Sequence, residues 1–423
     1  MIEELCESFG IDARVRKAAL QARERTHAIA YPAQERVKMR VLRAFVDEGI
    51  AESDLAGTSG YGYDDAARER YESLLGRVLG AQRVVARLSI VSGTHAIVAA
   101  LAACVQPGKR LIAAAGRPYD TLRNAICDAE FSLVASGIHY EEIALRDDGA
   151  ADLDAIAGAA AAPDAGAVFI QRSRGYAARP SLDVASCGRI VAAVKDVAPH
   201  VPVLVDNCYG ELVEEFEPTH AGADMLMGSL IKNLGGSLAP GGGYVAGRAD
   251  LIERVSARLY APGLRAALGP TLGLGRAFVQ GLFVAPLVVE QTLRGLDFAA
   301  ALFAELGYEV DPQPGATRTD IVQAIRLREP QRVLRFAAGL QAAMPVNARF
   351  RPEPGPVPGY VDPVVMSSGA FIGGATIELS CDAPLREPFE VYLQGGVVAE
   401  HTMLGSLLAA QAVVTGGAFA PFE

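Results

Sequence analysis

A lysine and an aspartate, which together can support covalent amine chemistry, stand at the ends of two predicted strands. Asp206 closes the short apolar run VPVLVDN, and Lys232 follows a second apolar run, ADMLMGSLI. Apolar, β-branched runs predict buried strands, and open α/β sheets bind ligands at the carboxyl ends of their strands. Glycine is frequent in residues 233–243, directly after the lysine. We expect burial to disfavour the ammonium form of Lys232 and to prime its amine for a Schiff base.

One cofactor, pyridoxal 5'-phosphate, uses both residue types at once. An aspartate keeps its ring nitrogen protonated so that the ring accepts electrons, while a lysine amine holds its aldehyde. Taken singly, a lysine at a strand end is more often a solvated surface residue, and an aspartate there is usually a turn former. Their combination predicts a pyridoxal-phosphate site at Asp206 and Lys232.

A Ser-Gly-Thr turn could bind the phosphate of such a cofactor. Ser92, Gly93 and Thr94 precede a predicted helix at residues 95–104. A helix N-terminus offers backbone N–H groups and a positive dipole end to an anion. The alternative is that Thr94 only caps the helix, and His95 is expected to pack or cap rather than act as a base.

Three tyrosines lie in loops where an aromatic ring could serve a cofactor. Tyr119 belongs to a strand-to-helix loop at the same edge of the predicted sheet as Asp206 and Lys232. Its ring could stack on a flat heteroaromatic group or simply pack the loop against the core. Tyr61 and Tyr63 lie in GTSGYGYDD, an exposed loop rich in glycine. That loop could equally be a helix-entry turn with packing aromatics, and Asp64 or Asp65 could cap the helix that follows.

The pattern of elements predicts an α/β fold with two main parts. Strands alternate with helices over residues 84–247, which indicates a mostly parallel sheet with helices on both faces. We expect a helical arm at residues 1–60, with helices near 2–9 and 11–48 and a break at Pro32. A large cofactor-binding domain would span 61–290, and a smaller α+β domain would span 291–423. In the smaller domain, TDIVQAIRL and GATIELS are expected to be strands, with a helix near 330–343.

Composition limits the class of protein. The 423 residues are 51% hydrophobic and 21% charged, as in a globular chain with a large core. The charged, amphipathic N-terminus lacks the build of a secretory signal and no apolar run reaches membrane-spanning length, so we expect a cytoplasmic protein without a membrane partner. The net charge of −10 argues against a nucleic-acid surface. Six scattered cysteines suit core positions, so neither a disulfide framework nor a metal site is expected.

Several motifs together resemble a known enzyme family. SGTHA, PYDTL, VDNCYGE and SLIKN, in this order and spacing, resemble the fold-type-I pyridoxal-phosphate enzymes of Cys/Met metabolism. The likeness is greatest to the methionine gamma-lyase-like branch that is often labelled aluminium resistance protein. It covers nearly the whole chain, from GYGYDD to IELSCDAPLREP. The motifs are specific together and unspecific singly.

The resemblance implies a role for each of these residues. Lys232 would form the Schiff base and move protons, and Asp206 would face the pyridine nitrogen. Gly93, Thr94 and Ser229 would hold the phosphate within a cofactor-binding set that also includes Ser92 and Cys208. Tyr119 would stack on the ring and assist proton transfer. Tyr61 and Tyr63 would reach the phosphate of a neighbouring subunit, which implies a dimer at least and commonly a tetramer.

This chain departs from the better-known gamma-lyase pattern at four positions. Cys208 replaces a threonine two residues after the aspartate, and Ile231 replaces the threonine before the lysine. Tyr63 stands where that pattern has a phosphate-binding arginine. Glu378 corresponds to the C-terminal arginine that clamps the substrate carboxylate. Arg174 or Arg386 would have to bind that carboxylate, since a guanidinium is its natural partner.

The expected activity is elimination of a β- or γ-substituent, such as a thiol, from an amino-acid substrate, giving a 2-oxo acid and ammonia. Replacement at the γ-position uses the same chemistry. Transamination, a retro-aldol cleavage and a low-turnover, cofactor-binding stress protein stay as alternatives. The SxxK pattern formed by Ser229 and Lys232 also occurs in serine acyl-enzymes, but the chain lacks their SDN and KTG motifs.

Overall fold

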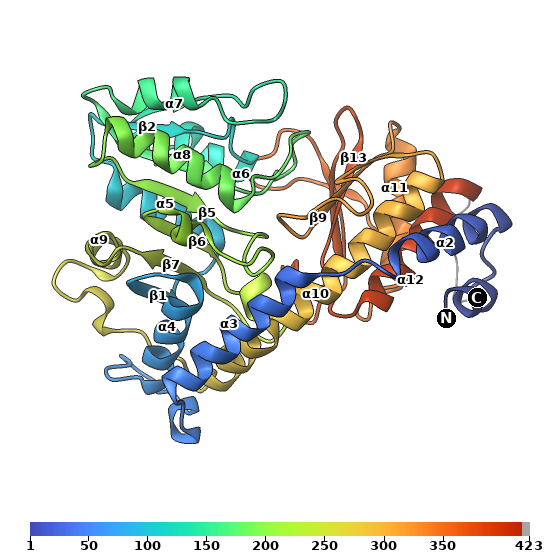
Figure 1. Ribbon diagram of the computed structural model, residues 1–423, viewed down its shortest axis with the longest axis horizontal. Helices are drawn as coiled ribbons and strands as arrows, with labels where there is room; N and C mark the ends of the chain where they lie inside the picture. Colours follow the sequence, from blue (N-terminus) through green and yellow to red (C-terminus); the bar gives the residue numbers. More distant parts are fainter. Residues whose placement is uncertain (417–423) are drawn as a thin grey trace. The chain divides into compact units, whose positions relative to one another are not determined.

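The computed structural model describes residues 1–416, which form two compact units. One unit is Ala33–Pro286, and the other combines Met1–Pro32 with the chain from Leu287 onward. Figure 1 labels their elements. The predicted arm, residues 1–60, is divided between the units at Pro32, and the functional domains 61–290 and 291–423 stay predictions.

The unit Ala33–Pro286 is built on a seven-stranded sheet of order β1-β7-β6-β5-β4-β2-β3. The pairs β2 with β3, β2 with β4, β4 with β5 and β5 with β6 are parallel, and β7 runs antiparallel to β1 and β6. This confirms the predicted mostly parallel sheet. The strands are β1 (Arg83–Arg87), β2 (Arg110–Ala113), β3 (His139–Glu142), β4 (Ala165–Gln171), β5 (Val203–Asp206), β6 (Met225–Ser229) and β7 (Gly243–Gly247).

Both faces of this sheet are buried. On one face, Phe169 and Leu204 pack in a core with residues of α5 and α9. The alternating residues Val168 and Val205 point to the opposite face and are also fully buried, as expected for a sheet that helices cover on both sides. The helices of this unit are α3 (Pro32–Glu48), α4 (Ala66–Leu79), α5 (Gly93–Cys104), α6 (Asp120–Arg123), α7 (Leu153–Ala160), α8 (Val184–Val197) and α9 (Ala249–Tyr260).

Short helical turns lie in the loops of the same unit, and a long helix begins in it. Helix α10 (Gly275–Glu305) contains Pro286, the last residue of this unit. The short turns are η1 (Glu52–Leu55), η2 (Asn124–Asp128), η3 (Pro218–Ala221), η4 (Asn233–Gly235) and η5 (Arg265–Ala267).

The other unit contains a six-stranded antiparallel sheet of order β10-β11-β12-β13-β9-β8. Helix α11 packs on α12 and on β11, and α2 contacts α12. The elements are α1 (Ile2–Ser8), α2 (Ala13–Thr26), β8 (Glu309–Asp311), β9 (Val322–Arg326), α11 (Pro330–Gln341), β10 (Pro354–Gly355), β11 (Val364–Ser368), β12 (Ser380–Pro384), β13 (Glu390–Gln394) and α12 (Ala399–Thr415).

One predicted strand is wrong. The segment GATIELS forms turns, and the strand β12 begins only at Ser380. The side chain of Glu378 accepts the backbone N–H groups of Phe371 at 2.7 Å and Ile372 at 3.3 Å. These two bonds fold the segment back on itself, which an extended strand cannot do.

No helix within residues 1–416 is both long enough and apolar enough to cross a membrane.

Candidate active site

The predicted site residues of the large sheet meet at the carboxyl ends of three adjacent parallel strands. Strand β5 ends at Asp206, which lies opposite Gln171 of β4 and Met227 of β6. Strand β6 ends at Ser229, and Lys232 follows after one short turn. The lysine and the aspartate therefore lie at the same edge of the sheet, where α/β folds bind ligands.

The start of helix α5 approaches the same strand ends. A Cβ on Gly93 would lie 3.3 Å from Cys208 Sγ and 3.4 Å from Ser229 Cβ. Ser92 is the N-cap, because its hydroxyl accepts the backbone N–H of His95 at 3.1 Å. The expectation that Thr94 is a plain cap is wrong. Helix geometry leaves the N–H groups of Gly93 and Thr94 without intrahelical partners, so this turn can bind an anion.

Thr94 instead connects the turn to Tyr119. The two hydroxyl oxygens are 2.7 Å apart. The backbone N–H of Tyr119 donates to Gln171 Oε1 at 2.8 Å, so the tyrosine is fixed from both sides. Burial, reinforced by the negative charge of Asp206, raises the pKa of Tyr119, and the phenol keeps its proton at neutral pH. Sequence analysis missed Gln171; its only signal was a polar residue at the end of an apolar strand.

Asp206 is a buried carboxyl whose immediate neighbours include a thiol. Its Oδ1 accepts the backbone N–H of Cys208 at 3.1 Å, and it is 4% exposed. Burial raises the pKa of Asp206, although the charge of Lys232 and the N–H of Cys208 act in the opposite direction. Cys208 is also buried, and burial raises the pKa of its thiol well above the ordinary value.

Lys232 is half-buried and packs on an aromatic ring. Its Nζ lies 3.8 Å from the centroid of the Tyr209 ring. Burial lowers its pKa, but Cys208, Tyr209, Asp206 and Tyr119 raise it, and the net pKa is well above the ordinary value. Burial by itself thus disfavours the ammonium, as expected, while the nearby acidic groups act in the opposite direction and the net pKa is raised.

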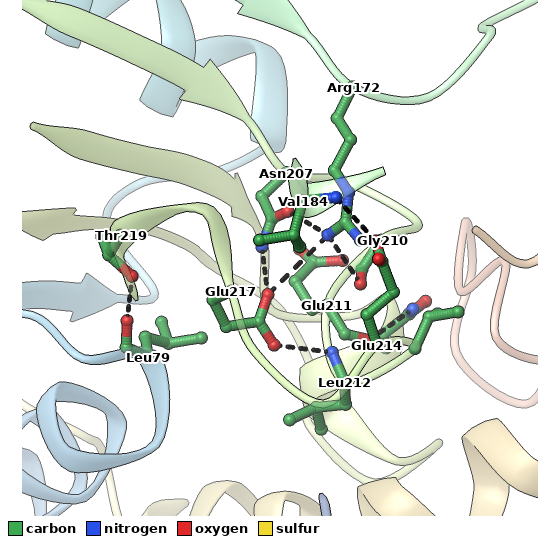
Figure 2. A network of polar contacts seen from close by, with 12 residues as sticks. Leu79, Arg172, Val184, Asn207, Gly210, Glu211, Leu212, Glu214, Glu217 and Thr219 are labelled. Carbon is green, nitrogen blue, oxygen red and sulfur yellow. Dashed lines mark hydrogen bonds and ion pairs between the residues drawn. The ribbon is translucent and has the colours of Figure 1, made fainter. Parts of the chain in front are cut away.

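The loop after Asp206 is fixed by a buried arginine, which Figure 2 shows. Arg172 Nη1 donates to Asn207 Oδ1 at 2.7 Å and to the carbonyl of Gly210 at 2.9 Å, and Nη2 bonds Glu214. Asn207 Nδ2 in turn donates to Glu217 Oε2 at 2.9 Å. Arg172, Asn207 and Glu217 are all 0% exposed. Sequence analysis did not single out this network, since nothing local relates an arginine to acidic residues so far along the chain.

The two candidate substrate arginines belong to different units. Arg174 is 3% exposed and lies in the loop after β4, where its backbone N–H donates to Ser181 Oγ at 3.2 Å. Its neighbour Gly175 approaches Tyr119, since a Cβ there would lie 3.3 Å from the tyrosine Cβ. Arg386 lies in the unit that holds β12, with its Nη1 3.7 Å from Asp362 Oδ2.

Tyr61 and Tyr63 project from a loop that is itself held firmly. Their side chains are 74% and 57% exposed, with ring centroids 6.1 Å apart. The buried carboxylate of Asp65 accepts bonds from the backbone N–H and hydroxyl of Thr58 and of Thr271, and caps α4 through the N–H of Arg68. Residues 57–65 are thereby fastened to the segment around Thr271, while both rings face outward.

These residues fit pyridoxal phosphate by their chemistry. Lys232 offers an amine for the aldehyde, Asp206 a buried carboxylate for the ring N–H, Tyr119 a flat face, and the α5 start an anion cradle. Gly93 supports this reading, because the close contact with Cys208 and Ser229 leaves little room for a side chain. Among residues 1–416, no group of three or more His, Cys, Asp or Glu side chains could hold a metal ion.

Comparison with known proteins agrees with this geometry. Residues 12–414 match the methionine gamma-lyase family. The uncharacterized protein YnbB of Bacillus subtilis (strain 168) is 41% identical over 371 residues, covering 87% of this chain and 88% of the relative. A carbon-sulfur lyase involved in aluminum resistance from Clostridium novyi NT is 36% identical with a TM-score of 0.91, covering 97% of this chain and 98% of that chain.

A more distant structure shares the fold alone. The pyridoxal-5'-phosphate-dependent protein YhfS from Escherichia coli has a TM-score of 0.56 at 20% identity, over 90% of this chain and 96% of that chain. The predicted fold type I is thus confirmed, as is the resemblance on which it was based. The match over nearly the whole length shows that this chain belongs to the methionine gamma-lyase family.

Proposed function

We propose that this protein is a pyridoxal-phosphate-dependent carbon–sulfur lyase. It eliminates a thiol or a similar heteroatom group from the β- or γ-carbon of an amino acid, and hydrolysis of the resulting enamine by one water leaves a 2-oxo acid and ammonia. The observation that supports this most directly is the convergence of Lys232, Asp206, Tyr119 and the α5 start at one sheet edge. Family membership and the similarity to a carbon-sulfur lyase point to the same chemistry.

In this proposal the cofactor supplies one property, a ring that accepts negative charge from the substrate α-carbon. The chain supplies everything else. The carboxylate of Asp206 holds a proton at the ring nitrogen. The N–H groups of Gly93 and Thr94 and the hydroxyl of Ser229 bind the phosphate, and Tyr119 covers one face of the ring.

Lys232 and Tyr119 move the protons of the reaction. The Lys232 amine removes the α-proton and becomes an ammonium, which is stable here because its neighbours raise its pKa. As the carbon–sulfur bond breaks, the leaving sulfur takes a proton from this ammonium or from the Tyr119 phenol. The phenol of Tyr119 carries a proton at neutral pH, because burial raises its pKa. Arg174 binds the substrate carboxylate.

The test is a screen of sulfur- and oxygen-substituted amino acids with the purified protein and added pyridoxal phosphate. Products are identified by mass spectrometry, and both ammonia and amino transfer to an oxo acid are measured. We expect ammonia together with a 2-oxo acid. Amino transfer without ammonia, or cofactor binding without any turnover, would replace the lyase proposal with a transaminase or a binding protein.

Two variants assign the roles. Lys232→Ala should lose both the visible absorbance of the lysine-bound cofactor and turnover, because it removes the amine that would hold the cofactor aldehyde. Asp206→Asn should keep part of that absorbance but lose turnover by about 100-fold or more, since an amide cannot hold the ring proton. Full turnover in Lys232→Ala would show that the lysine assignment is wrong.

A further inference from the structure

Tyr209 provides the aromatic ring that the amine of Lys232 contacts, and the lyase chemistry proposed above gives it no role. The Lys232 Nζ lies 3.8 Å from the centroid of the Tyr209 ring, which is within the range of a cation–π interaction. Among residues 1–416, this nitrogen forms no ion pair and no hydrogen bond. An ammonium that is half-buried needs a partner to compensate for the lost water. The face of an aromatic ring carries partial negative charge, so the Tyr209 ring is that partner.

The backbone of Tyr209 is in an unusual conformation. Its φ is +71°, in the left-handed region that favours glycine and that a bulky side chain rarely adopts. The next residue is a glycine, yet Gly210 does not lie in that region. The chain therefore has a tyrosine at the position where a glycine would be less strained. Strain of this kind persists only where the surrounding structure fixes it, and it is concentrated at functional sites.

Hydrogen bonds to two successive carbonyl groups fix this backbone. Asn233 Nδ2 donates to the carbonyl of Tyr209 at 3.0 Å, and Arg172 Nη1 donates to the carbonyl of Gly210 at 2.9 Å (Figure 2). A Cβ on Gly210 would collide with the same Nη1, so the arginine requires glycine at position 210. Because Asn233 directly follows Lys232, its bond also fastens the Tyr209 ring to the segment that carries the amine.

We propose that Tyr209 is a positioning residue whose ring binds the ammonium form of Lys232 and holds it in one place. The proposal deepens the proposed function and rests on it in one respect. In the lyase reaction the freed Lys232 amine takes the α-proton and becomes an ammonium, while Asp206 is engaged with the ring nitrogen of the cofactor. The face of Tyr209 then stabilises this charge and fixes the position from which the proton is passed on. No bond to Tyr209 forms or breaks.

The first experiment observes the Lys232 amine by NMR in the full-length protein without cofactor. Reductive methylation with isotope-labelled formaldehyde labels the five lysines of the chain, and Lys232→Arg assigns the Lys232 signal. A methylated ammonium still binds an aromatic face, so the ring current of Tyr209 should displace this signal upfield. Tyr209→Phe should keep the displacement and Tyr209→Leu should abolish it, while the other four lysine signals stay in place. A Lys232 signal that is the same in the wild type and in Tyr209→Leu would overturn the proposal.

The second experiment uses the protein with added pyridoxal phosphate. Tyr209→Leu should keep the visible absorbance of the lysine-bound cofactor, because the bond between lysine and cofactor does not involve the tyrosine. It should lower kcat by about tenfold and change KM by less than about twofold, since only the ammonium formed during turnover loses its partner. Tyr209→Phe is the conservative variant and should recover most of kcat, because it keeps the aromatic face. An equal loss of kcat in both variants would show that the hydroxyl acts instead of the ring, which contradicts the proposal.

The outcomes separate this inference from the proposed function. If the wild type has no lyase activity but Tyr209 displaces the Lys232 signal, the lyase proposal is wrong and the binding of the ammonium by the ring stands. If the wild type is an active lyase and Tyr209→Leu has the same kcat, only the role of Tyr209 is wrong. Leucine and phenylalanine both keep a Cβ at the left-handed position, so the backbone strain is the same in each variant, and circular dichroism checks that both fold.

Discussion

Gly93 is important because it has no side chain at the point where the start of α5 approaches the end of β6. Its backbone angles do not require glycine, since it does not lie in the left-handed region. The constraint is contact: an added Cβ would lie 3.3 Å from Cys208 Sγ, which is a tight contact, and at ordinary contact distances of 3.4 and 3.5 Å from Ser229 Cβ and N. Glycine here lets the first turn of α5 approach the end of β6, which is what brings its N–H groups to the sheet edge.

Gly93→Ala should weaken the affinity for pyridoxal phosphate by about threefold, because the one tight contact, with Cys208 Sγ at 3.3 Å, must be relieved by a small shift that costs roughly 0.7 kcal/mol. Absorbance titration with the cofactor measures this. The control is Gly158→Ala, on helix α7, where nothing lies within 4 Å of the new Cβ. It should stabilise the fold by about 0.5–1 kcal/mol and leave the affinity unchanged. If Gly93→Ala bound the cofactor with wild-type affinity, the start of α5 would not be the phosphate-binding site.

At the scale of an element, the loop of residues 207–217 depends on Arg172. The guanidinium contacts the side chain of Asn207, the carbonyl of Gly210 and two carboxylates, so it fixes both ends of the loop (Figure 2). Because Arg172 is buried, these contacts differ from ordinary surface ion pairs: without it, the buried carboxylate of Glu217 would keep only Arg40 as a cationic partner.

Arg172→Ala should lower the free energy of unfolding by about 3–5 kcal/mol, since Glu217 would remain buried. Denaturant unfolding measures the loss. Arg43→Ala is the control: Arg43 pairs with Asp47 one turn away, and its side chain is 78% exposed. Its effect should stay within about 0.5 kcal/mol. Similar small losses in both variants would mean that the buried network does not stabilise the loop.

The loop that carries Tyr61 and Tyr63 also contains Asp65, whose carboxyl makes the stability of the protein depend on pH. Burial raises the pKa of Asp65, but hydrogen bonds from the backbone N–H groups of Arg68, Thr271 and Thr58 and from the Thr58 hydroxyl lower it to about 2, against an ordinary value of 3.8. Between about pH 2 and pH 3.8, the folded state thus binds fewer protons at Asp65 than the unfolded state does. The stability contributed by Asp65 is therefore fully present above pH 3.8 and disappears as pH falls through about 2.

Asp65→Asn should reduce the free energy of unfolding at pH 7 by on the order of 3 kcal/mol and should flatten its decline in acid. Unfolding curves recorded from pH 7 to pH 2 test both effects. Asp64→Asn is the matched control, because Asp64 is exposed and asparagine tolerates its positive φ of 53°. If the free energy of unfolding of Asp65→Asn still declines in acid as it does in the wild type, other carboxyl groups cause the decline.

At the scale of the whole molecule, the exposed tyrosines predict that the active unit contains more than one chain. Held on a rigid loop, they cost little ordering entropy when a partner covers them. If they complete the phosphate site of a second copy, Lys232→Ala and a Tyr61→Ala/Tyr63→Ala double variant should each be inactive alone. Coexpressed, they should recover part of the activity, because some mixed sites combine an intact lysine with intact tyrosines.

Activity of the coexpressed pair is compared with that of each variant coexpressed with itself. No recovery, in assemblies shown by light scattering to contain both chains, would mean that the tyrosines act within their own subunit or not at all. The same light-scattering measurement distinguishes a dimer from a tetramer.

The sequence by itself determined the kind of fold, and it predicted which lysine and aspartate would lie at one edge of the sheet. The strand ends at Asp206 and shortly before Lys232, the helix start after Ser92 and the cap at Asp65 were all predictable, because each is set by residues a few positions away. Alternation of strands and helices likewise indicated the mostly parallel sheet, since both periodicities are local properties of the chain.

Only the tertiary structure decided the partners of these residues. GATIELS is not a strand because Glu378 bonds two amides, and the pKa of Lys232 is raised despite burial because groups from separate elements, Asp206 among them, lie near it. Neither the contact of Glu211 with Tyr244 nor that of Arg172 with Asn207 leaves a local pattern. Charge balance and burial depend on packing between distant segments, and these determine the proton affinities on which the chemistry relies.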